Sequence, residues 1–116
     1  MQRIARARFV LLFAVVGLVM ACTDSKSAEM SGEQAKDPVL VQGEQVYQEN
    51  CAQCHGKAGG GGAGPKLAGG RVVADFPDPA AQAEVIREGR GSMPAWGAKL
   101  SADEIDAVVR YTREVL

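Results

Sequence analysis

Histidine is nearly absent from this sequence of 116 residues, because His55 is the only one. Cysteine is also scarce and occurs only at Cys22, Cys51 and Cys54. A structural zinc site needs four nitrogen, sulfur or oxygen ligands in tetrahedral geometry. The chain has no second Cys-x-x-Cys pair and no pair of histidines with which to close such a site. A metal bound by His55 must therefore take any further ligand from another residue type.

The sequence also lacks a long apolar run at its amino terminus. Residues 9–20 are apolar, but twelve residues fall short of the ~20 that a helix needs to cross a bilayer. Arg3, Arg6 and Arg8 precede this run, and the small residue Ala21 follows it. A basic region, a short apolar region and a small residue together are typical of an export signal. We therefore predict that residues 1–21 are a signal peptide.

The residues at the end of this signal resemble a bacterial lipoprotein cleavage box. The segment Val19-Met20-Ala21-Cys22 would make Cys22 the lipidated first residue of the mature chain. An odd number of cysteines in an exported protein needs an explanation, and lipidation of Cys22 provides one. This predicts a membrane anchor on the periplasmic side of a bacterial membrane. The alternative is ordinary cleavage nearby, which would leave a soluble periplasmic protein with a spare thiol.

The net charge of the chain limits the kinds of partner that it is expected to bind. Removal of residues 1–21 leaves 10 basic and 14 acidic residues. A mildly acidic chain of this kind is not expected to bind nucleic acid.

The segment Cys51-Ala52-Gln53-Cys54-His55 is the most informative motif. On a helical turn, positions i, i+3 and i+4 share a face, so both thiols and the imidazole point the same way. Cys-x-x-Cys-His is typical of covalent haem attachment. A thioredoxin-like dithiol is the alternative, but no alternation of strands and helices accompanies the motif. We predict one covalent haem c held by Cys51 and Cys54, with His55 as an axial ligand of its iron.

Hydrophobic periodicity predicts an all-α domain. Helical patterns begin near residue 38, at residues 78–79 and at residue 101, and only residues 71–73 are ambiguous between helix and strand. Residues 22–37 contain little to bury, which predicts a flexible tether before a domain at residues 38–116. The glycine-rich residues 59–64 are not a phosphate-binding loop, because Pro65 follows them in place of Lys-Ser/Thr. We interpret them as a flexible insert that passes the edge of the cofactor.

The order of these features resembles the class I c-type cytochromes. After the export signal, a first helix, Cys-x-x-Cys-His, Gly-Pro-x-Leu, a middle helix, Met-Pro and a last helix follow one another over residues 38–116. The resemblance implies a small fold of three to four helices wrapped around one haem. It also implies a close crossing of the first and last helices, at which Gly43 and Tyr111 match the family positions.

The resemblance extends to the haem pocket. Met93 is the only methionine within residues 38–116, and the segment Gly91-Ser92-Met93-Pro94 resembles the family's ligand loop, which implies that Met93 is the second axial ligand. The carbonyl group of Pro65 would accept a hydrogen bond from His55, and Leu67 would pack against the porphyrin. We expect Trp96 to pack against the haem as well, and consider Trp96, Tyr47 and Arg71 as candidates for contact with the haem propionates.

His/Met ligation leaves no open site on the iron, which predicts a one-electron carrier rather than an enzyme. Its partners would be redox proteins that donate and accept electrons. One alternative is a cytochrome subunit of a larger oxidoreductase. Another is a gas-binding or sensing haem protein in which a small ligand displaces Met93.

Overall fold

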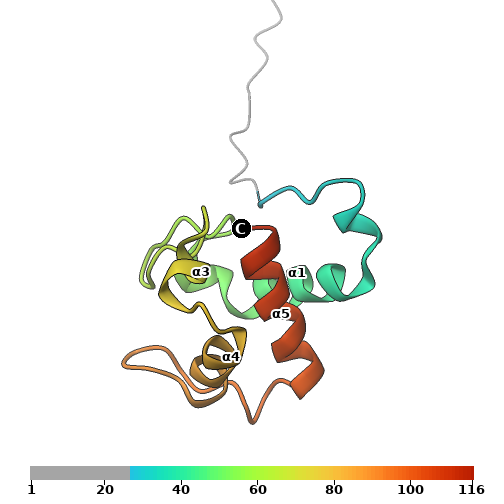
Figure 1. The fold of residues 1–116 in the computed structure, drawn as a ribbon. Helices are drawn as coiled ribbons and strands as arrows, with labels where there is room; N and C mark the ends of the chain where they lie inside the picture. Colours follow the sequence, from blue (N-terminus) through green and yellow to red (C-terminus); the bar gives the residue numbers. More distant parts are fainter. Residues whose placement is uncertain (1–26) are drawn as a thin grey trace, which may run out of the picture.

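The computed structural model describes residues 27–116, in which every regular element is a helix (Figure 1). The elements are η1 (Gln34–Lys36), α1 (Pro38–Asn50), α2 (Ala52–His55), α3 (Arg71–Asp75), α4 (Pro79–Glu88) and α5 (Ala102–Glu114). This confirms the all-α prediction and resolves the ambiguity at residues 71–73, which belong to α3. The predicted signal peptide and Cys22 lie outside the described residues.

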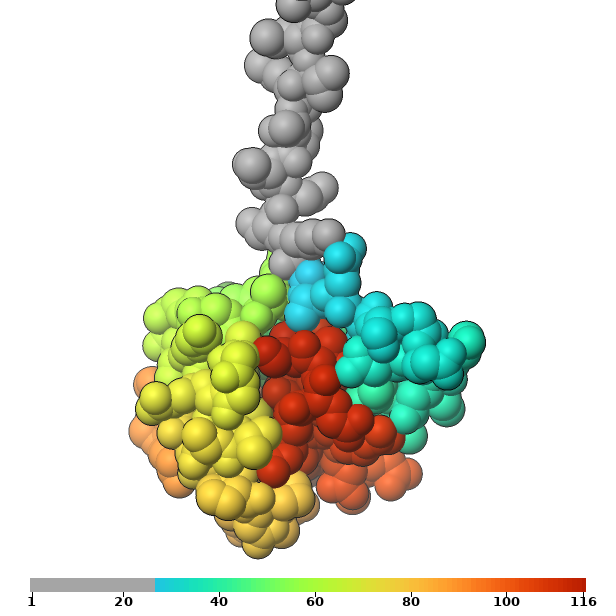
Figure 2. All heavy atoms as spheres, turned by 45° about the horizontal axis from the view of Figure 1, so that its top comes forward, coloured from blue at the N-terminus to red at the C-terminus, as the bar shows by residue number. Residues whose placement is uncertain are grey.

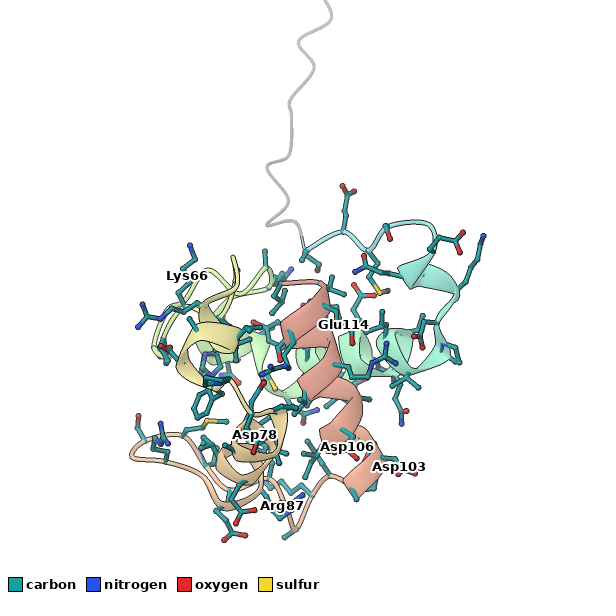
Figure 3. The ribbon with its side chains drawn as sticks, viewed as in Figure 1. Lys66, Asp78, Arg87, Asp103, Asp106 and Glu114 are labelled. Carbon is teal, nitrogen blue, oxygen red and sulfur yellow. The ribbon has the colours of Figure 1, made fainter. Side chains whose placement is uncertain are left out.

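The helices begin where local capping chemistry dictates. The Asp78 carboxylate accepts from the backbone N–H of Ala80, and Pro79 occupies the first helical position of α4. Ser101 and Glu104 form the capping box predicted at the start of α5, since each side chain binds the other residue's backbone N–H. Asp103 and Asp106 lie on the exposed side of this helix (Figure 3). Capping thus fixes the starts of α4 and α5.

Helices α1 and α5 cross closely at the centre of the domain. A β-carbon built on Gly43 would lie 2.8 Å from both the carbonyl carbon of Ala107 and Cβ of Tyr111, so only glycine fits at this point. The ring centroids of Tyr47 and Tyr111 lie 5.4 Å apart, and both residues are fully buried. The helix crossing implied by the resemblance to class I cytochromes is therefore present, and it leaves one side of α5 free to face α4.

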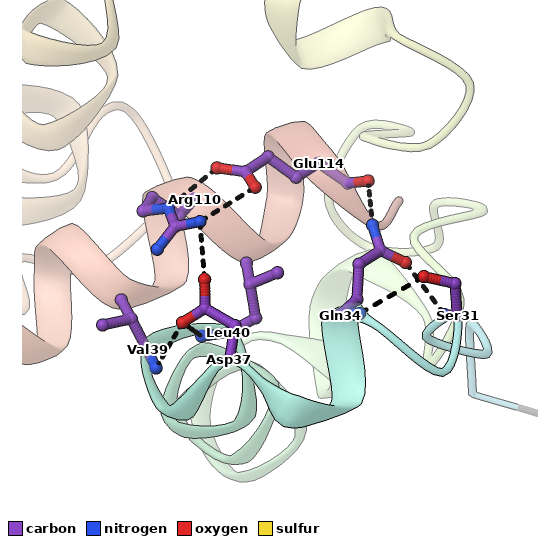
Figure 4. A network of polar contacts seen from close by, with 7 residues as sticks. All are labelled: Ser31, Gln34, Asp37, Val39, Leu40, Arg110 and Glu114. Carbon is purple, nitrogen blue, oxygen red and sulfur yellow. Dashed lines mark hydrogen bonds and ion pairs between the residues drawn. The ribbon is translucent and has the colours of Figure 1, made fainter.

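The segment before α1 lies against the domain. The side-chain amide of Gln34 donates to the carbonyl oxygen of Glu114 at 2.8 Å, and Arg110 binds Asp37 at 3.0 Å (Figure 4). Met30 is partly buried against the hydrophobic core. The later part of the predicted tether therefore contacts α5 in this structure, close to the carboxyl end of the chain (Figure 1).

From outside, α5 runs across one face between the α3–α4 region and the start of α1 (Figure 2). Among the described residues, no helix has both the length and the apolar character needed to cross a bilayer.

Candidate haem site

Helix α2 brings the three residues of the Cys-x-x-Cys-His motif to the wall of one cavity. The backbone N–H groups of Cys54 and His55 both donate to the carbonyl oxygen of Cys51, at 3.1 and 3.0 Å, which closes a single helical turn. All three residues line a cavity of about 800 Å³. Ligand sites commonly have volumes of roughly 300–1,000 Å³. The turn therefore presents two thiols and one imidazole to a cavity of suitable size.

The imidazole of His55 is held in one orientation. Its Nδ1 atom lies 2.8 Å from the carbonyl oxygen of Pro65. Since a carbonyl oxygen can only accept, Nδ1 carries the proton and Nε2 keeps its lone pair. A β-carbon on Gly64 would lie 2.8 Å from Cε1 and 2.9 Å from Nδ1 of this ring. Glycine at residue 64 is thus required for the ring to lie where it does.

The glycine-rich loop at residues 59–64 is folded back onto α2. Gly64 donates to the carbonyl oxygen of Cys54, and Gly61 donates to that of His55, both at 2.8 Å. Gly61 has φ of +97°, which a residue with a side chain rarely adopts. These contacts correct the prediction of a flexible insert, because the loop satisfies the free carbonyls at the end of α2 and carries Pro65 to His55.

Met93 reaches the same cavity from a separate loop. Arg90 and Met93 exchange two backbone hydrogen bonds of 3.1 and 2.9 Å, which form a narrow turn. The loop then returns to α4, where the backbone N–H of Trp96 donates to the carbonyl oxygen of Ile86 at 3.0 Å. This last bond satisfies a carbonyl that the end of the helix leaves without a partner. The methionine side chain is partly buried and packs against the core.

Gly89 makes this return possible. It ends α4 with φ of +77°, and a β-carbon there would lie 2.7 Å from the carbonyl oxygen of Met93.

The rest of the cavity wall agrees in large part with the sequence-based candidates. Pro65, Leu67, Trp96 and Tyr47 all line it. Arg71 does not, because it lies on the exposed side of α3 and pairs with Asp75 at 2.9 Å. Among the candidates for propionate contact, Trp96 and Tyr47 therefore line the cavity, whereas Arg71 does not line it and is paired with Asp75, which does.

Sequence reasoning missed a buried polar pair in this wall. Gln82 Nε2 donates to Thr112 Oγ1 at 2.7 Å, and both residues are almost fully buried while lining the cavity. Thr112 Oγ1 in turn donates to the carbonyl oxygen of Val109 at 3.0 Å. Their positions on the inner faces of α4 and α5 were the only available signal. Each fits a helical stripe that is otherwise apolar.

Burial affects the acidity of one thiol of the motif. Desolvation, and to a smaller extent Cys54, raises the pKa of the Cys51 thiol to about 11. At neutral pH this thiol is protonated, and the protonated form is a poor nucleophile. Within residues 27–116, no three His, Cys, Asp or Glu side chains cluster as a metal site.

Residues 38–111 match the family model described as cytochrome c oxidase, cbb3-type, subunit III. The chain belongs to the c-type cytochromes. It is 36% identical over 73 residues to cytochrome c6 of Euglena gracilis, covering 60% of this chain and 84% of that protein. It is also 36% identical over 79 residues to the cbb3-type cytochrome c oxidase subunit FixP of Bradyrhizobium diazoefficiens, covering 65% of this chain but only 27% of that longer protein.

A solved structure agrees in fold as well. Cytochrome c6C from Synechococcus sp. PCC 7002 matches with a TM-score of 0.53 and 35% sequence identity, over 63% of this cytochrome and 92% of that chain. The prediction of a small class I cytochrome c fold is confirmed. Covalently bound haem c is the cofactor of this family, and the cavity with its two thiols and one imidazole fits it. Haem-based electron transfer, as a carrier or as a subunit of an oxidase complex, is thereby confirmed as the function.

Proposed function

We propose that this cytochrome carries one electron at a time on a single haem c with His55 and Met93 as axial ligands. One observation carries the proposal. The His55 and Met93 side chains come from different elements but line one cavity, and Nδ1 of His55 is already engaged by Pro65. That contact leaves Nε2 as the only ring nitrogen able to bind iron. A ligating histidine whose other ring nitrogen donates to a carbonyl is a common arrangement at metal centres.

The chemistry supplied by the bound haem is the Fe(II)/Fe(III) couple. The protein's own residues hold and shield it. Cys51 and Cys54 would form its two thioether bonds, while Leu67 and Trp96 would exclude water from its faces. A methionine thioether is a soft ligand that favours the ferrous state and so raises the reduction potential. With both His55 and Met93 bound to the iron, no coordination site would remain for a substrate.

We further propose that residues 1–21 direct export and are removed, and that Cys22 carries lipid that tethers residues 38–116 to the periplasmic side of a bacterial membrane. The support is the basic, apolar and small-residue order of the segment and the odd cysteine. Mass spectrometry of the mature amino terminus tests this proposal. Lipid on Cys22 is the expected result, and an unmodified terminus would contradict it.

A subunit role in a larger oxidoreductase is the second candidate. It is favoured by the family description and by FixP, an oxidase subunit of which this chain spans about a quarter. Purification of the native protein from membranes separates the two roles. A free carrier is recovered alone, whereas a subunit is recovered with an oxidase.

Carbon monoxide binding tests the ligand assignment against a gas-binding role. The reduced wild-type protein should bind no carbon monoxide, because both axial positions are filled. A potentiometric titration should give one wave for one electron, with one haem per chain. Ready binding of carbon monoxide by the wild-type protein would contradict the carrier role.

A further inference from the structure

Arg90 is the single Lys or Arg among the described residues that line the haem cavity. It follows Gly89 at the end of α4 and opens the loop that carries Met93. Its side chain is exposed to solvent at the mouth of the cavity. The residue therefore places a permanent positive charge at the edge of an otherwise largely apolar site.

The other arginines described by the structure are engaged with polar partners. Arg71 pairs with Asp75 at 2.9 Å, Arg87 with Glu84 at 2.8 Å, and Arg110 with Asp37 at 3.0 Å. Arg113 donates to the backbone carbonyl oxygens of Phe76 and Pro77 and to the side chain of Gln82. Within residues 27–116, the Arg90 guanidinium has neither a hydrogen bond nor an ion pair.

The contact that Arg90 does make leaves its hydrogen-bond donors available. Its Cζ atom lies 5.3 Å from the ring centroid of Phe76, which also lines the cavity. A guanidinium that stacks on an aromatic ring uses its face, whereas its N–H donors lie in its plane. The stacking contact thus restricts the side chain at the cavity mouth while its donors remain free for a planar anion.

We propose that the Arg90 side chain binds a propionate carboxylate of the haem. The inference rests on the proposed single haem in this cavity. The carboxylate is the chemical group that a guanidinium fork recognises best, through two parallel N–H···O bonds. Asp75, the carboxylate that also lines the cavity, is already paired with Arg71 and does not compete.

Arg90 would also connect the haem edge to the methionine loop. Its backbone exchanges hydrogen bonds with Met93 in both directions, so a side chain fixed on the propionate restrains the same turn that positions the thioether. Neutralising a carboxylate near the iron disfavours the ferric state and raises the reduction potential. Arg90 is in this sense a positioning residue that acts on the cofactor through its carboxylate.

The test compares Arg90→Gln with Arg87→Gln, which loses the same charge from an arginine that pairs with Glu84, and neither Arg87 nor Glu84 lines the cavity. The midpoint potential and the propionate band in the resonance Raman spectrum are measured on the haem-loaded proteins. We expect Arg90→Gln to lower the ferrous-to-ferric ratio at fixed potential roughly threefold to tenfold, where tenfold corresponds to about 59 mV, and to shift the Raman band. Arg87→Gln should resemble the wild type in both, and Arg90→Lys should fall between.

An unchanged propionate band in Arg90→Gln, or equal effects of the two glutamine variants, would overturn the proposal. Haem content measured from the absorption spectrum shows whether each variant still folds around its cofactor. If Arg90→Gln does not bind haem, the same two measurements are made on Arg90→Lys. Failure of the His55/Met93 assignment has a different signature, since the wild-type protein itself would then bind carbon monoxide.

Discussion

The imidazole of His55 and the carbonyl oxygen of Pro65 are joined by a 2.8 Å hydrogen bond between residues ten positions apart in the sequence. This contact assigns the proton to Nδ1 and directs the Nε2 lone pair toward the iron position. It depends on the glycine-rich loop, which returns to α2 through the hydrogen bond from Gly64 to Cys54. The loop is therefore part of the haem site and not merely a connection between helices.

Gly64→Ala tests the fit of this loop against the histidine. The new methyl group would lie within 2.8–2.9 Å of two atoms of the His55 ring, so the ring or the loop must move. Overpacking of this kind costs about 1–3 kcal/mol of the free energy of unfolding. Urea unfolding of the haem-loaded protein measures the loss.

Gly60→Ala is the matched control, because a β-carbon at Gly60 meets nothing within 4 Å. It should change stability by no more than about 0.5 kcal/mol. Equal effects of the two substitutions would show that Gly64 does not define the position of the ring.

Gly43→Ala tests the crossing of α1 and α5. In the interior of a helix this change usually stabilises by about 0.5–1 kcal/mol, because alanine restricts the unfolded chain. Here the β-carbon would press on Ala107 and Tyr111, so we expect the opposite sign and a loss of about 1–3 kcal/mol. Thermal unfolding followed by circular dichroism measures the effect. The control is Gln42→Ala on the exposed side of α1, and a stabilising Gly43→Ala would contradict the close crossing.

The two packed tyrosines should respond differently to loss of their hydroxyl groups. Tyr47 donates to the carbonyl oxygen of Gly56 at 2.7 Å, so Tyr47→Phe should cost about 1 kcal/mol of stability. Among residues 27–116, the buried hydroxyl of Tyr111 has no hydrogen-bond partner. Tyr111→Phe should therefore leave stability unchanged or raise it slightly. Chemical unfolding of both variants measures the change in stability. Equal losses of stability in the two variants would contradict this distinction.

The ion pair that fixes the segment before α1 predicts a dependence on pH. The hydrogen bond from Arg110, together with the backbone N–H of Val39, lowers the pKa of Asp37 below its usual value of 3.8. The folded state therefore favours the ionised carboxylate, and the resulting stability is present above pH 3.8 and is lost as the pH falls through the lowered pKa. Asp37→Asn keeps a capping oxygen for α1 but removes the charge.

The melting temperature of Asp37→Asn should lie below that of the wild type near pH 6, and the two should converge at acidic pH. For Asp106→Asn, on the exposed face of α5, the difference in melting temperature from the wild type should not depend on pH in this way. A constant difference between wild type and Asp37→Asn at every pH would indicate that the charge of Asp37 does not contribute.

Several parts of the site could be predicted from sequence because each is a local signal. Cys51, Cys54 and His55 fall on one turn, and Asp78 and Ser101 with Glu104 are recognisable helix caps. Other parts depend on tertiary contacts that leave no periodic pattern. The Gln82–Thr112 hydrogen bond joins residues thirty positions apart. Likewise, the sequence makes Arg71 a candidate and does not single out Arg90, and only the folded loop shows that it is Arg90 that lines the cavity.

The absorption spectrum of the ferric protein, compared between wild type and Met93→Ala, tests the central claim most directly. Met30→Ala is the control, because Met30 also packs against the core but does not line the cavity. We predict a methionine–iron charge-transfer band in the wild type and in Met30→Ala. We predict its loss in Met93→Ala, together with carbon monoxide binding after reduction. Persistence of the band in Met93→Ala would contradict the assignment of Met93 as the axial ligand.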